Sequence, residues 1–84
     1  MSSMLPFRYK DDIKLTILSL LNSLGAVNPS RAISLNELAK LLGLPVDKLQ
    51  NSVEELSRNG YVNKVDSKIY INNKGIMLFI GIIS

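Results

Sequence analysis

The stretch that decides the fold covers residues 33–62 and reads ISLNELAKLLGLPVDKLQNSVEELSRNGYV. Its first part carries a capping box, because the Ser34 hydroxyl can accept a hydrogen bond from the Glu37 amide while the Glu37 carboxylate reaches back to the Ser34 amide. Leucine and alanine residues then repeat at helical spacing until Gly43, which suits the left-handed backbone that ends a helix. The pattern predicts a short helix that begins directly after Ser34.

A second helix is predicted over residues 46–59, after a short turn. Pro45 suits its first position, where the missing amide hydrogen would have been unpaired, and Asn59-Gly60 ends it. The buried stripe of this helix is predicted to be Val46, Leu49, Val53 and Leu56. The sequence therefore predicts two consecutive helices that share one apolar core.

The residues before this stretch predict an arm and a longer helix. Residues 1–10 include Pro6 and are expected to form an N-terminal arm. From Asp11 or Asp12 apolar residues recur at three- and four-residue intervals, with Asp11 as the N-terminal cap and Gly25 as the end. Residues 25–33 are predicted to be a loop that ends in a short strand.

The residues after the stretch predict a β-hairpin and an apolar tail. Residues 61–65 and 68–72 are predicted strands, joined by a tight turn at Asp66-Ser67. Residues 76–83 form an apolar run without a charge, which fits a buried helix or a buried strand equally well. A membrane span needs about 20 apolar residues, so this run alone is too short to cross a bilayer.

The composition bounds the function. The 84 residues suffice for one small domain, and an apolar share of 46% rules out a disordered chain. There is no cysteine and no histidine, which excludes thiol nucleophiles, zinc clusters and histidine general bases. We therefore predict no catalytic residue, no metal site and no cofactor, and expect a protein that is not an enzyme. A cytoplasmic location is the default expectation, because no run of signal-peptide length opens the chain.

Residues 33–62, followed by KIYINNKG at residues 68–75, resemble the winged helix-turn-helix family, in particular small prokaryotic regulators, archaeal ones included. Asn72 to Gly75 stand where such proteins have a Thr-x-Lys-Gly-type start of a further helix. The resemblance implies a mainly α fold with a small β-hairpin. A three-helix core and a wing would occupy residues 11–74, and an apolar C-terminal helix would occupy residues 75–84.

The resemblance also implies that the protein binds double-stranded DNA as a transcriptional regulator, with the N-terminal half of helix 46–59 in the major groove. Asparagine and glutamine can pair with adenine, lysine can donate to guanine or phosphate, and a helix N-terminus can meet a phosphate. The expected DNA contacts are Arg31, Ser34, Asn36, Asp47, Lys48, Gln50, Asn51, Arg58, Lys64 and Lys68. The alternatives are an ordinary solvated helix face and, for the two wing lysines, the protection of a sheet edge.

The charge distribution supports a second hypothesis. The chain has a net charge of +3, but residues 34–60 carry three basic and four acidic side chains, a net charge of −1. A slightly acidic helix in this position favours a winged-helix module that binds proteins in a larger assembly, without binding DNA. DNA binding and protein binding without DNA therefore remain as two alternative functions.

The apolar tail predicts a homodimer. As a helix it has apolar residues on more than one face, and each large side chain left in water would forgo about 1.5–3 kcal/mol of burial. The predicted interface residues are Phe7, Leu15, Leu18, Ile76, Leu78, Phe79, Ile82 and Ile83. The alternative is that the tail folds wholly back onto the first helix of the same chain.

Overall fold

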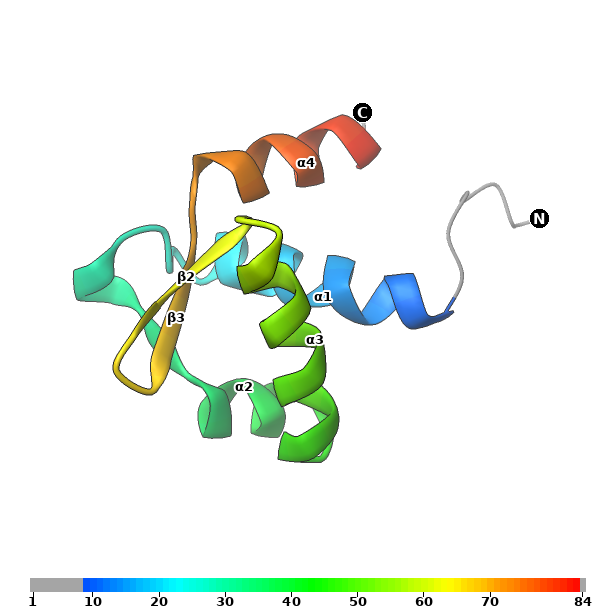
Figure 1. Ribbon diagram of the computed structural model, residues 1–84, viewed down its shortest axis with the longest axis vertical. Coiled ribbons are helices and arrows are strands. Elements are labelled where there is room, and N and C mark those ends of the chain that lie inside the picture. The colour runs from blue at the N-terminus through cyan, green and yellow to red at the C-terminus, as the bar shows by residue number, and fades with distance from the viewer. Residues whose placement is uncertain (1–8, 84) are drawn as a thin grey trace.

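A small antiparallel sheet lies beside four α-helices in the computed structural model, which describes residues 9–83 and the side chains of residues 13–81 (Figure 1). The strand order is β1 (Ile33–Ser34), β3 (Lys68–Ile71) and β2 (Val62–Val65), so the last strand of the chain is the central one. In the β2–β3 hairpin Asp66 adopts a left-handed φ of 58°, which aspartate tolerates in a tight turn. The predicted fold class, mainly α with a small hairpin, is confirmed.

The helices follow the predicted order. They are α1 (Tyr9–Ser23), the single 3-10 turn η1 (Pro29–Arg31), α2 (Leu35–Leu42), α3 (Val46–Arg58) and α4 (Asn73–Ile83).

The local signals around α2 act as predicted. Ser34 Oγ accepts a hydrogen bond from the Glu37 amide at 3.2 Å. Gly43 has a left-handed φ of 68°, and its amide donates to the carbonyls of Ala39 and Lys40. Pro45 differs from the prediction, because its extended ψ of 144° makes it the N-cap of α3 rather than its first residue.

Two helix boundaries also differ from the prediction. The first helix begins at Tyr9, so Asp11 lies inside it and is not its cap. Neither Tyr9 nor Lys10 opposes helical backbone, which explains the earlier start. Helix α3 ends at Arg58, one residue earlier than predicted, with Asn59 as its C-cap. The rest of the expected arm, residues 1–8, lies outside the described residues.

The hydrophobic core lies where α1, α2, α3 and the sheet meet. Its buried side chains are Ile17, Leu18, Leu21, Ala26, Leu38, Ala39, Leu49, Val53, Leu56, Val62, Ile69 and Ile71. Three of the four residues predicted for the buried stripe of α3 belong to it. Val46, the fourth, is 37% exposed, because it is the first residue of α3 and lies at the end of the buried stripe.

The apolar tail is a helix that packs against α1 and β3. In Figure 1 it lies at the opposite side of the molecule from α2. Asn72 Oδ1 accepts a hydrogen bond from the Gly75 amide at 2.9 Å, and Lys74 Nζ donates to the Asn59 carbonyl at 3.0 Å. Lys74 Nζ also lies 5.2 Å from the centre of the Tyr61 ring. These contacts join the first turn of α4 to the end of α3.

Candidate nucleic-acid interface

Five of the predicted DNA contacts gather between α3, the hairpin and the start of α2. One hollow, of about 210 Å³, has Gln50 on one side and Lys64 and Lys68 on the other. An adjoining hollow of about 200 Å³ is lined by Ser34 and Asn36. Leu35 and Ser67 line both hollows, so the start of α2 and the tip of the hairpin form one continuous surface.

The outward face of α3 carries the other predicted contacts. Asp47, Lys48, Asn51 and Arg58 are all exposed. At 100° per residue, Asn51 and Arg58 point most directly away from the buried stripe. Lys48 leans to one side of this outward line and Gln50 leans to the other, toward the hairpin. The exposed face of α3 is therefore polar along its whole length.

The acidic character of α3 is offset by two lysines from other elements. Lys64 on β2 forms an ion pair with Glu54 at 2.6 Å, and Lys14 on α1 forms one with Glu55, also at 2.6 Å. The hydrogen bond from each lysine, and then its charge, holds the pKa of each carboxyl below the ordinary value, with Arg58 lowering both further. Both glutamates are thus ionised at neutral pH and locally compensated.

Lys48 on α3 and Lys68 on β3 are cations without a partner in the described part of the chain. Among the described residues, the ammonium groups of Lys48 and Lys68 have neither a hydrogen-bond nor an ion-pair partner. Lys68 ends the hairpin turn and pairs through its backbone with Ser34 at the start of α2. Its side chain lines one pocket with Ser34 and Glu37 at the start of α2. The helix dipole adds a positive field there, which the Glu37 carboxylate in the first turn of α2 partly offsets.

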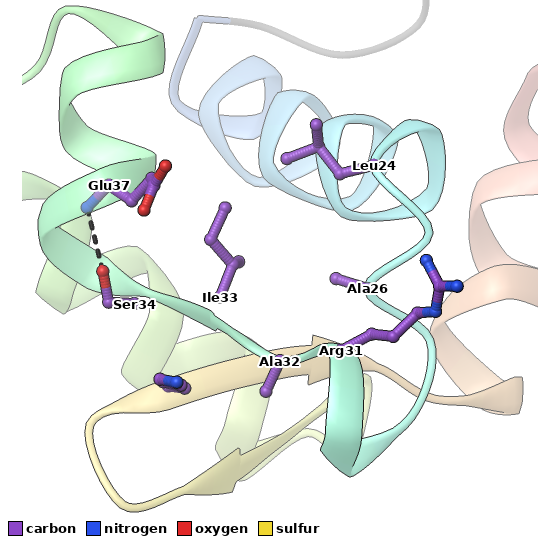
Figure 2. Close-up of a pocket in the computed structure, with 8 residues that line it drawn as sticks. Leu24, Ala26, Arg31, Ala32, Ile33, Ser34 and Glu37 are labelled. Atoms are coloured by element: carbon purple, nitrogen blue, oxygen red, sulfur yellow. Dashed lines mark hydrogen bonds between the residues drawn. The ribbon is translucent and has the colours of Figure 1, made fainter.

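Arg31 lies apart from the predicted contacts on α3, although it lines a pocket with Ser34 and Lys68. Figure 2 shows its guanidinium beside the loop at Ala26, at the opposite end of a pocket from Ser34 and Glu37. This pocket of about 310 Å³ is lined by Lys68 but by no residue of α3. The structure therefore does not bring Arg31 together with the helix predicted to read bases.

No protein family, curated protein or solved structure matches this chain. The geometry and charge of the described residues therefore carry the proposal for function. Among the described residues, no group of acidic side chains forms a potential metal site.

Sequence reasoning missed three features of this surface. It did not place Ser67 beside the start of α2, because that contact depends on the pairing of β1 with β3. It did not pair Glu54 with Lys64, which lies ten residues away on another element. It also assigned Val46 to the core, although a residue at the first position of a helix often lies at the end of the buried stripe.

The predicted dimer interface requires correction. Leu18 is 0% exposed within its own chain, so it offers no surface to a second copy. Ile76, Leu78 and Phe79 are partly buried against the same core, as the alternative of packing within one chain predicts, and Leu15 is also partly buried. Phe7 and the side chains of Ile82 and Ile83 lie outside the described part of the structure.

The exposed face of α4 consists of other residues. Met77 is 73% exposed, Ile80 is 50% exposed, and Gly81 is exposed beside them. Over residues 9–83, none of the helices combines the length and apolar character needed to span a bilayer.

Proposed function

We propose that the protein binds double-stranded DNA, with the outward face of α3 in the major groove and the β2–β3 hairpin along the flanking backbone. The observation that carries this proposal is the position of Lys68, a cation without an ion-pair partner among the described residues, which lines one pocket with Ser34 of α2 and a second hollow with Gln50 of α3. An α-helix fits the major groove, where Asn51 and Gln50 can pair with adenine and Lys48 can donate to guanine.

The start of α2 is suited to a phosphate. Ser34 Oγ already accepts the Glu37 amide, so the hydroxyl hydrogen remains available to donate to a phosphate oxygen. The exposed amide of Asn36 lines the same hollow. These groups fix the position of a protein on the duplex without reading its sequence.

The ion pairs weaken the case for the alternative function. Residues 34–60 have a net charge of −1 when counted alone. In the folded protein Lys14 and Lys64 bind two glutamates of this segment. Residues 34–60 together with these two lysines have a net charge of +1. A protein-binding module therefore has less support from charge in the folded protein than in the sequence.

Fluorescence anisotropy with labelled duplex DNA tests the proposal. The wild-type protein should bind duplex DNA at about 50 mM salt and lose affinity as salt rises, because phosphate contacts release counterions. Lys68→Ala should weaken binding to all sequences alike and reduce the salt slope by about one. Arg31→Ala also removes one positive charge, but at a position remote from α3. It should therefore lower the affinity for DNA less than Lys68→Ala does. The absence of binding to any duplex at this salt would overturn the proposal and favour the protein-binding module.

We further propose that two copies pair through the exposed face of α4. A helix on the surface of a soluble protein normally carries charged residues on its outer face. From residue 76 to residue 83 this helix has none. Gly81 leaves open space on the outside, since a Cβ there would meet no atom within 4 Å, so another helix can approach closely. Because α4 lies across the molecule from α2, this pairing leaves the proposed DNA surface free (Figure 1).

Substitution of Met77 tests the pairing. Met77→Glu should convert a dimer into a monomer, because it places a charge at the most exposed apolar side chain among those of α4 that the structure describes. Light scattering after size exclusion measures the mass directly. Leu41→Glu is the matched control, since Leu41 is 55% exposed on α2 and should leave the mass unchanged. A wild-type protein that is monomeric at all concentrations would contradict the dimer.

A further inference from the structure

Val46 is an apolar side chain placed within the polar surface described above. It is the first residue of α3 and is 37% exposed. It forms part of the rim of two hollows, one of about 710 Å³ shared with Asn36 and Pro45 and one of about 200 Å³ shared with Ser34 and Ser67. An apolar group therefore stands between polar side chains at the end of α3 that faces both α2 and the hairpin.

The local backbone holds this side chain in a defined position. Pro45 precedes it with φ −64° and ψ 144°, and the Pro45 carbonyl accepts the Leu49 amide at 3.1 Å. The branched side chain of valine has one strongly preferred rotamer in a helix. Val46 thus offers two methyl groups at a fixed place, and it has no hydrogen-bonding group in its side chain.

We propose that Val46 contacts the C5-methyl group of a pyrimidine in the major groove, so that the protein distinguishes thymine and 5-methylcytosine from their unmethylated counterparts. This inference rests on the proposed DNA binding. The N-terminal residues of a helix in the major groove contact base edges, and the C5-methyl is the apolar feature of those edges. Asn36 and Ser34 bind the neighbouring phosphates and thereby set the distance of Val46 from the bases.

Paired duplexes that differ only in the methyl group provide the test. Anisotropy would compare alternating adenine–thymine duplex with alternating adenine–uracil duplex, and cytosine with 5-methylcytosine in a second pair. The wild-type protein should prefer the methylated member of each pair by about fourfold, the value of one buried methyl contact. Val46→Ala should bind both members equally and match the wild type on the uracil duplex. Leu41→Ala, an exposed apolar control that lines neither hollow, should keep the preference.

The outcomes separate this inference from the proposed function. Equal binding of thymine and uracil duplexes by the wild type would overturn the role of Val46 and leave DNA binding intact. A preference that survives in Val46→Ala would also overturn it, because another group would then read the methyl. Failure to bind any duplex would instead overturn the proposed function. A cooperative thermal unfolding transition of Val46→Ala would show that this variant is folded in the binding experiments.

Discussion

Gly75→Ala is expected to lower the unfolding temperature by more than about 15 °C, or to abolish cooperative unfolding, because no space exists for the added methyl. Gly75 is buried in the first turn of α4. A Cβ at this position would overlap the backbone carbonyl oxygen of Tyr61 and lie 2.7 Å from Ile71 Cγ1. Backbone and β3 core atoms cannot move aside as the end of a flexible side chain can. Overpacking of this kind costs about 3 kcal/mol or more, and each kcal/mol lowers the unfolding temperature of a domain this size by about 4–8 °C.

Gly81→Ala is the matched control for this prediction. It lies in the same helix, but a Cβ there would meet nothing within 4 Å. Alanine favours helix over glycine by about 1 kcal/mol, so the control, measured at a concentration at which the protein is monomeric, should unfold at the wild-type temperature or above it. Circular dichroism during heating measures both variants. Equal unfolding temperatures for Gly75→Ala and the wild type would show that α4 does not start against Tyr61.

Asn72→Ala is expected to have the second largest effect, a loss of about 2–4 kcal/mol in the free energy of unfolding. The Asn72 side chain donates to the Gly60 carbonyl at 2.8 Å and to Asn63 Oδ1 at 3.0 Å, and it accepts from the Gly75 amide at 2.9 Å. Alanine makes none of these bonds, and it leaves the part-buried polar groups at Gly60 and Gly75 without this partner. Each lost bond costs about 1 kcal/mol, and the loss of a helix cap costs about as much again.

Urea denaturation distinguishes the parts of this contribution. Asn72→Ser keeps a hydroxyl oxygen that can accept from the Gly75 amide but loses both amide donors, so its stability should fall between those of Asn72→Ala and the wild type. Asn73→Ala, at an exposed neighbouring position in α4, should change stability by less than about 0.5 kcal/mol. A loss for Asn73→Ala as large as that for Asn72→Ala would contradict the role assigned to Asn72.

The features predicted correctly from the sequence depend on residues close together in the chain. The Ser34–Glu37 hydrogen bond spans three residues, Gly43 needs only its own backbone freedom, and the hairpin turn joins adjacent strands. The polar face of α3 followed from helical periodicity alone. The same periodicity places the predicted DNA contacts of α3 on the side of the helix that faces away from the core.

The start of α1, the N-cap role of Pro45 and the exposure of Val46 were missed at the ends of helices, whereas the other missed features depend on contacts between distant segments. The pairing of Lys14 with Glu55 requires knowing how α1 crosses α3, which no local pattern gives. A uniformly apolar helix also does not indicate which of its faces is covered. Leu78 and Phe79 were therefore predicted at an intermolecular interface, although they pack on the core of their own chain, whereas Met77 is exposed.

The contacts of Asn72 and Lys74 with residues 59–60 have a consequence for geometry. They bind the start of α4 to the two residues that directly follow α3, and so restrict the movement of one helix relative to the other. If α3 binds DNA and α4 joins two copies, as proposed, these bonds help to set the distance and angle between the two α3 helices within the protein rather than by the DNA. Such a dimer would tolerate changes in the bases between its two half-sites, but it would reject an operator with one base pair inserted or removed at the centre.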